Sequence, residues 1–374
     1  MNLVGTFEVL YSKTLNQLFF VSKNVGDPTG TGQGGRVLYI NTVTPGSGAR
    51  TLIVPPKVLA NGGTGRFTTA IDLQNQSKDY SYNLTAQVRK RYSNNWEGLV
   101  AYTYSRARDV ASFTSSTHIS NWQFGRTLSG RQDEAFTTTS LFDQPHKILA
   151  TGTYTLNWLK KLSTDFSVFY QGVSGPPHDY IYGGSGGAGD LNGDGVQGND
   201  LIYIPTSATD PNQIQFRDIT RNIAPPGQPP NNQVISTAAQ QAALFEAFIN
   251  SSDCLKDHRG EILKRNSCRQ PFVNQVDLAI RQNLPLIADQ RVSVQFDIFN
   301  FGNLLNKKWG RAFVTPTTSN SNVPLMTHVG YSTATAQTAV PIVQFTPPSG
   351  GKEYAPGALV SNFWRSQVSV RFSF

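Results

Sequence analysis

The sequence predicts an all-β protein, an antiparallel β-barrel that crosses a membrane, with long loops on one rim and a short helix within them. Three observations predict this fold. Apolar and polar residues alternate over long segments, these segments run to about 9–13 residues, and aromatic residues stand near their ends on the apolar side. Because successive strand side chains point to opposite faces, each segment would present one apolar and one polar face.

The alternation is clearest in the segment 80–92, which places Tyr80, Leu84 and Val88 on one face and Asn83 and Gln87 on the other. Lys90 is the one charged interruption of its apolar side. The same pattern recurs in five further segments: 96–106, 147–158, 272–282, 291–299 and 366–374.

The length of these segments favours a membrane-crossing barrel. Strands of globular proteins run to about 5–6 residues, whereas crossing a bilayer takes about 9–11 tilted residues. Tyr80, Tyr92, Trp96, Tyr104 and Trp158 stand near segment ends on the apolar side, where amphipathic rings meet the membrane–water interface. A large soluble antiparallel sheet with one exposed face is the alternative. We favour the barrel because no second set of core-forming elements is evident.

The connections between segments alternate in length. Those at 92–97, 159–165 and 284–290 are short, whereas 111–144, 184–270 and 302–340 are long and polar. Outer-membrane barrels have short turns on one rim and long exterior loops on the other. We therefore expect 184–270 to be a long extracellular loop region, with a helix at about 236–249.

Composition restricts the class of protein further. Of 374 residues, 38% are hydrophobic, and the net charge of +8 is scattered, the densest basic run being 89–91. A distributed charge without a basic patch argues against a nucleic-acid partner. No stretch approaches the roughly 18 apolar residues of a membrane helix. The first residues lack the features of a signal peptide. Either the protein is cytosolic or its true N-terminus is missing, and the membrane-spanning strands favour a missing N-terminus.

Five segments carry a family likeness: 78–110, 143–154, 189–205, 296–306 and the terminal aromatic strand. They resemble the C-terminal barrel of TonB-dependent outer-membrane receptors of the Oar-like type. The resemblance implies a 22-stranded barrel in the outer membrane of a Gram-negative bacterium, holding an N-terminal plug that couples to TonB. Only about 10–13 candidate strands and no plug are found. Residues 1–374 are therefore expected to be the C-terminal part of such a receptor, without the plug and signal peptide.

This resemblance implies a non-enzymatic receptor that, in the intact protein, binds and imports an unidentified ligand. Its partners would be outer-membrane lipid and, through the missing plug, TonB. The alternative is a smaller complete barrel or surface adhesin that binds through its loops without transport. A secreted carbohydrate-active enzyme finds no support, since no pair of carboxylates can be nominated. The five histidines fall in no ligand or nucleophile motif, so no cofactor is required.

The terminal segment 361–374 is predicted to be the last barrel strand. Val368, Val370, Phe372 and Phe374 would share its apolar face. By resemblance, such a strand is the signal that the barrel assembly machinery reads, and edge pairing could recognise it through backbone hydrogen bonds and alternate side chains.

A loop with calcium-site spacing is the sharpest chemical motif. Asp190, Asn192 and Asp194 alternate and Gly195 follows, as in the first half of a calcium loop. The twelfth position, which needs a bidentate carboxylate, is Leu201, with Asn199 and Asp200 before it. Structural Ca²⁺ and a turn held by side-chain hydrogen bonds both remain open.

Two further sets of residues are singled out. Cys254 and Cys268 would form a disulfide in an oxidising compartment, which stabilises by about 3 kcal/mol for a loop of this size. A reduced pair is the alternative, and zinc is disfavoured because no Cys-x-x-Cys occurs. Basic residues of the polar face would line the lumen, as solvated wall residues or as contacts to a plug or anionic solute: Arg89, Arg91, Arg281, Arg291 and Arg371.

Overall fold

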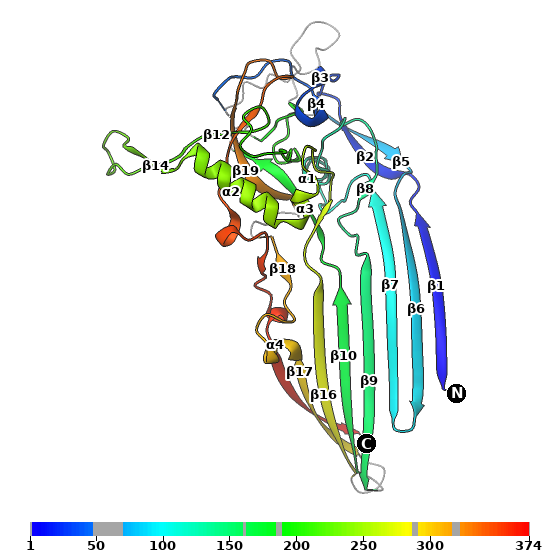
Figure 1. Cartoon of the computed structure of the whole chain (residues 1–374). Helices are drawn as coiled ribbons and strands as arrows, with labels where there is room; N and C mark the ends of the chain where they lie inside the picture. The colour runs from blue at the N-terminus through cyan, green and yellow to red at the C-terminus, as the bar shows by residue number, and fades with distance from the viewer. Residues whose placement is uncertain are drawn as a thin grey trace.

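The protein consists of a curved antiparallel sheet and a head built from the long connections (Figure 1). The computed structural model describes residues 2–47, 70–159, 162–184, 189–285, 291–315 and 322–373. Antiparallel strands dominate and helices are few, which confirms the predicted class. Among the described residues, no helix is both long and apolar enough to span a membrane.

Eight long strands form the sheet, in an order that follows the chain. They are β1 (Leu3–Lys13), β6 (Tyr80–Ser93), β7 (Trp96–Asp109), β9 (His146–Leu159), β10 (Leu162–Val173), β16 (Val273–Pro285), β17 (Arg291–Phe299) and β22 (Arg365–Ser373), with the short β8 (Thr138–Thr139) beside β7. Every neighbouring pair is antiparallel. Within the described residues this is fewer than the 10–13 strands expected, because the long connections fold into the head.

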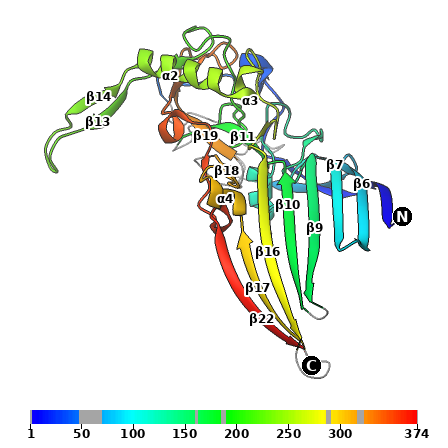
Figure 2. The ribbon, with the colours of Figure 1, turned by 60° about the horizontal axis from the view of Figure 1, so that its bottom comes forward.

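The sheet is not closed. Strands β1 and β22 lie at opposite edges, and the view in Figure 2 shows the sheet curving from one to the other. The eight strands alternate in direction, so the two edge strands β1 and β22 run in opposite directions. An even number of additional strands between them would close an antiparallel barrel.

A tight turn connects β6 to β7 at the rim opposite the head. Asn94 and Asn95 join β6 to β7 and have φ angles of 54° and 65°. Two successive residues with positive φ form the hairpin turn whose twist matches that of the strands, and asparagine tolerates this conformation well. The predicted short turn at 92–97 is thus confirmed, while parts of the other two fall outside the described residues.

The apolar face of the sheet has no covering layer among the described residues. Phe7, Val100, Trp158 and Val370 are 71%, 57%, 61% and 69% exposed. The register keeps apolar residues in rows across the strands, as where Phe7 lies opposite Ala86 and Ala86 opposite Tyr102. An uncovered apolar face of this extent requires an apolar medium around it.

Lys90, the charged interruption of the apolar face, makes three hydrogen bonds at the turn. Its ammonium donates to the carbonyl and hydroxyl oxygens of Ser93 at 2.7 and 2.9 Å and to the carbonyl oxygen of Trp96 at 2.8 Å. It also lies 4.0 Å from the centroid of the Trp96 ring. The charge therefore reaches the rim while its aliphatic stem covers apolar surface, as lysines do at membrane interfaces.

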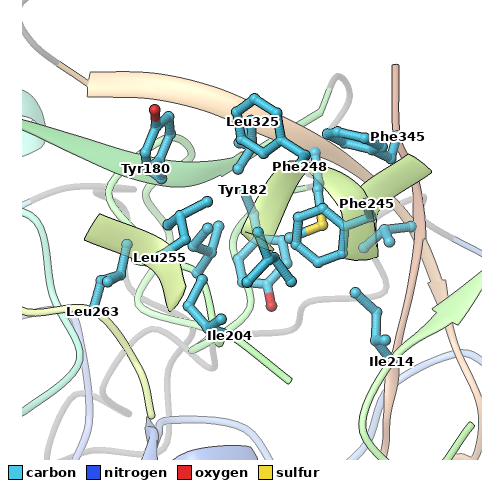
Figure 3. Packing of buried hydrophobic residues seen from close by; sticks show 14 of the residues in the cluster. Tyr180, Tyr182, Ile204, Ile214, Phe245, Phe248, Leu255, Leu263, Leu325 and Phe345 are labelled. Atoms are coloured by element: carbon cyan, nitrogen blue, oxygen red, sulfur yellow. The ribbon is translucent and has the colours of Figure 1, made fainter. Parts of the chain in front are cut away.

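The head has its own hydrophobic core (Figure 3). It surrounds a five-stranded mixed sheet in the order β12 (Gln215–Phe216), β20 (Pro341–Gln344), β19 (Asn322–Tyr331), β11 (Pro177–Gly183) and β15 (Cys268–Arg269). Smaller pieces of the head are β2 (Gln17–Ser22), β3 (Gly30–Thr31), β4 (Val37–Leu38), β5 (Ile71–Gln76), β13 (Ile219–Asn222), β14 (Asn232–Ser236), β18 (Phe313–Val314) and β21 (Ala355–Pro356), with helices α1 (His118–Phe124), α3 (Asp253–Lys256) and α4 (Phe301–Leu305) and 3₁₀ turns η1 (Gln33–Gly35), η2 (Pro348–Gly351) and η3 (Val360–Asn362).

Helix α2 (Ala238–Ser251) packs on this core and confirms the helix predicted at 236–249. Thr237 and Gln240 form a capping box, each side chain accepting from the other's backbone N–H. Phe245 and Phe248 are buried, and both rings contact that of Phe345, at centroid distances of 5.0 and 5.7 Å. The predicted loop region 184–270 is thus largely a folded part of the head.

Candidate functional site

Two ion pairs, one buried and one half-buried, join the head to the rim of the sheet. At the end of β7, the Asp109 carboxylate binds the Arg265 guanidinium and accepts from the hydroxyls of Ser112 and Ser140 at 2.7 and 2.6 Å. Both ion-pair side chains are largely buried. Charges removed from water need such full hydrogen bonding, so this contact fixes the position of the head segment that carries Arg265.

The second pair lies just before β9 and β16. The Arg269 guanidinium binds the buried Asp143 carboxylate at 2.6 Å and donates to the carbonyl oxygens of Asp143 and Gly175 at 2.7 and 2.8 Å. Burial lowers the pKa of Arg269, while the Asp143 carboxylate counteracts this shift. Both pairs link residues more than 100 positions apart, and sequence reasoning missed them because neither has a local signal.

A cleft of about 750 Å³ opens in the head near the start of β16. Its lining includes Cys254, Arg269, Phe313, Lys352, Glu353 and Tyr354. Because β16 begins at Val273, the Arg269 wall of the cleft stands at the rim of the sheet. The size lies within the range of ligand sites, and an aromatic lining with a few charged groups is typical of them.

Hydrogen bonds hold the walls of this cleft. The Tyr180 hydroxyl donates to the Glu353 carboxylate at 2.9 Å, and the Tyr354 hydroxyl donates to the Arg269 carbonyl at 3.0 Å. Burial is the main cause that raises the pKa of Tyr354 well above its ordinary value. Tyr354 is therefore a neutral donor, and its ring is fixed as part of the wall.

The predicted disulfide is present and lies at this cleft. Cys254 and Cys268 are bonded, with their Cα atoms 5.4 Å apart, which is within the usual range. Cys254 belongs to α3 and Cys268 to β15. The bond ties the end of the helical segment to the head sheet, so the wall of the cleft is covalently braced.

The calcium-like loop is buried in the head. Asp190, Asn192, Asp194, Asn199 and Asp200 are each at most 3% exposed. The Asp190 carboxylate accepts from the backbone N–H of Gly193 and Gly195 at 2.8 and 3.0 Å. The described residues contain no group of three or more His, Cys, Asp or Glu side chains that could hold a metal ion. Calcium binding stays a prediction, which calorimetric titration of chelator-treated protein with Ca²⁺ would check.

Asp200 takes part in a different contact from the one the motif suggests. Its carboxylate binds the Arg36 guanidinium at 2.6 Å and accepts from the Leu191 backbone N–H at 2.8 Å. Burial raises the pKa of Asp200 above its ordinary value, and the Arg36 cation opposes that shift. The pair joins the N-terminal part of the head to the loop, and this role was not foreseen.

The polar face of the sheet carries hydrogen bonds between strands. Thr153 and Ser167 hydroxyls lie 3.0 Å apart, the Thr155 hydroxyl donates to the Asp165 carboxylate at 2.8 Å, and Arg281 Nε donates to Gln295 Oε1 at 2.7 Å. Such cross-strand pairs support the register, with polar side chains directed away from the apolar face.

Most of the predicted basic and terminal residues can be placed. Arg89, Arg281 and Arg371 alternate with the apolar residues of their strands and are exposed, and the Arg91 backbone N–H donates to the Asn2 carbonyl. The backbone of Arg291 begins β17. Val368, Val370 and Phe372 are exposed on edge strand β22, whereas Phe374 lies outside the described residues. That these arginines line a lumen, and that β22 is an assembly signal, remain predictions.

An apolar face that no described residues cover, strands of 9–14 residues and the tight β6–β7 turn together define a membrane-spanning β-barrel wall. Comparison with protein families agrees. The family model described as "Outer membrane beta barrel domain" matches residues 11–339, and the chain belongs to this family. The protein is accordingly located in the outer membrane. No curated protein and no solved structure matches the chain.

Proposed function

We propose that this chain is part of a TonB-dependent, Oar-like receptor that captures a ligand with its head and, in the intact protein, imports it without catalysing a reaction. The observation that carries the proposal is the cleft of about 750 Å³ at the start of β16, where a braced head meets the rim of the sheet. A ligand held there would stand at the mouth of the barrel. The sequence resemblance to Oar-like receptors supports the class.

The open edges of the sheet support the idea that further strands complete the barrel. Strand β1 is exposed along its whole length, as is most of β22. Unpaired backbone N–H and C=O groups are costly in lipid, so both edges need partners in the membrane. The plug and its contact with TonB belong to the same proposal, as does recognition of β22 by the assembly machinery.

Transport is tested in cells that carry the gene and in cells from which it is deleted. We expect cells with the gene to deplete a compound from the medium, and we expect a protonophore to stop the depletion. Lys352→Ala combined with Phe313→Ala, both in the cleft, should reduce it, whereas Lys264→Ala on the exposed head surface should not. Equal depletion by all strains would contradict the proposal.

The alternative function, binding without transport, is favoured by one feature of the head. The β13–β14 hairpin extends away from the rest of the molecule and exposes Ile223, Val234 and Ile235 (Figure 2). A two-stranded hairpin is marginally stable in water by itself, so a binding partner would stabilise it. An adhesin of this kind would bind its target equally well with and without a protonophore, and a complete smaller barrel would show heat-modifiable migration on a gel by itself.

A further inference from the structure

A cluster of exposed apolar side chains lies where β17 ends and β22 begins. It is formed by two segments, 300–312 and 359–364, which we call the apolar platform. Its exposed members are Leu304, Leu305, Trp309, Leu359, Val360, Phe363 and Trp364, between 42% and 69% exposed. Monomeric soluble proteins rarely expose so many large apolar side chains together.

Buried asparagines give the platform a defined structure. The Asn303 carboxamide donates to the Trp309 carbonyl at 3.1 Å and accepts from the Trp364 backbone N–H at 3.3 Å. Asn362 accepts from the Ala312 backbone N–H at 2.7 Å. Both asparagines are at most 4% exposed. Polar groups thus point inward and hold the two segments together, while the apolar side chains point outward.

The height of the platform follows from the strands that carry it. Strands β17 and β22 have nine residues each, whereas β6, β7 and β9 have 14. About 9–11 tilted residues cross the hydrocarbon of a bilayer. The Asn94–Asn95 turn marks one interface, so the ends of β17 and β22 near the platform lie at the opposite interface.

The charged residues of the two platform segments are all positive. Lys307, Lys308 and Arg311 lie within 300–312, Arg365 follows 359–364, and neither segment contains an Asp or Glu. The one carboxylate bonded to the described platform backbone is that of Asp277, which accepts from the Asn300 N–H at 2.7 Å. The Arg311 guanidinium lies 5.4 Å from the Phe363 ring centroid. Aromatic rings with adjacent Lys and Arg are typical of surfaces that sit among lipid headgroups.

We propose that the apolar platform is a lipid-binding surface that inserts its aromatic and leucine side chains at the head-side membrane interface and binds anionic lipid through its cations. It continues the lipid-exposed face of β22, where Val368 and Val370 are 67% and 69% exposed. This inference rests on the outer-membrane location of the chain and is independent of whether the protein transports a ligand.

Tryptophan depth measurements test the insertion. The full chain is reconstituted in phosphatidylcholine vesicles with bromine at carbons 6 and 7 or at carbons 11 and 12. In W96F/W122F/W158F, only Trp309 and Trp364 remain, and we expect the shallow bromine to quench them more strongly than the deep one. In the otherwise unchanged chain, W309F/W364F should reduce the emission that the shallow bromine quenches, and the quenching that remains should come from Trp96 and Trp158 of the sheet. A variant retaining only Trp122 of the head is the control and should not be quenched. Emission of Trp309 and Trp364 unaffected by either lipid would overturn the proposal, because the platform would then face water or protein.

Vesicle flotation tests whether the platform cations bind anionic lipid. We expect wild-type chain to bind vesicles with 30% phosphatidylglycerol more strongly than pure phosphatidylcholine. K307E/K308E should reduce binding to the anionic vesicles by roughly tenfold or more, since a lysine near an anionic surface contributes about 1 kcal/mol. The matched control K256E/K264E changes two exposed head lysines by the same charge and should stay within about twofold of wild type. Equal losses for both variants, no loss for either, or no flotation of the wild type would contradict the assignment.

Discussion

Phe7 of the sheet is 71% exposed, whereas Phe245 of the head is 0% exposed and packs on Phe216 and Phe345. The two regions contain the same kinds of apolar side chain and bury them in different media. The head buries its apolar side chains against one another, as a soluble domain does. The apolar face of the sheet is instead covered by lipid. A residue's contribution to stability therefore depends on the region in which it stands, and this difference can be tested.

The largest expected effect is in the head core. Phe245→Ala removes a fully buried ring, and such truncations cost about 3–5 kcal/mol. Urea unfolding in detergent, followed by near-ultraviolet circular dichroism, measures the loss. Phe7→Ala is the matched control in the sheet. Lipid or detergent refills the space that the ring leaves, so the cost should be limited to the transfer free energy of the ring, about 1.5–3 kcal/mol, and should be smaller than in the head. Similar losses at both positions would mean that the sheet has a protein core of its own.

Removal of the disulfide should have the next largest effect. Cys254→Ser combined with Cys268→Ser frees α3 from β15, and a loop of this size is stabilised by about 3 kcal/mol. We expect the head to unfold at lower urea, while the far-ultraviolet signal of the sheet changes less. A reducing agent should reproduce this result in the wild type. If neither treatment alters head unfolding, the bond has no role in bracing the cleft.

A charge placed on either face of β10 distinguishes lipid from water. Val168→Arg directs a cation into the apolar face and should destabilise vesicle-inserted protein by about 2–4 kcal/mol. Ser167→Arg, one residue earlier, directs the same cation to the polar face and should cost much less. Folding yield in vesicles, measured by protease protection, compares the two. Equal yields would argue against lipid contact of the apolar face.

The smallest effect concerns acid sensitivity of the head. His178 and His328 are at most 2% exposed, and burial, aided at His178 by Arg269, lowers the pKa of each to about 4. The unfolded chain binds their protons near pH 6.5, so their contribution to stability is full above pH 6.5 and is lost as the pH falls toward 4. At pH 5 the loss relative to pH 7 should be about 2 kcal/mol per histidine.

The unfolding temperature, measured at several pH values between 7 and 4, reports this loss. His178→Phe should make the unfolding temperature depend less on pH. His118→Phe, at an exposed histidine that begins α1, is the control and should leave the dependence of the unfolding temperature on pH unchanged. A wild-type profile without any fall below pH 6.5 would show that neither buried histidine remains neutral in the folded head.

Local pattern predicted much of the sheet. The alternation of 80–92 and 96–106 and the short connection at 92–97 predicted β6, β7 and the turn between them. The same alternation in β1 was overlooked, although Phe7, Val9 and Tyr11 share a face, because Val4 and Leu10 add apolar residues to the other face. The helix near 236–249 was also found from its sequence.

The sequence by itself determined most of the long strands of the sheet, their two faces and the cysteine pair, because a period of two residues and local spacing are visible in one segment at a time. Only the tertiary structure decided that the long connections share one core, that Arg265 binds Asp109 and Arg36 binds Asp200, and that a cleft opens beside the disulfide. These features depend on contacts between segments far apart in the chain, for which no periodic signal exists. The platform on β17 and β22 is of the same kind, since buried asparagines from two separate segments assemble it.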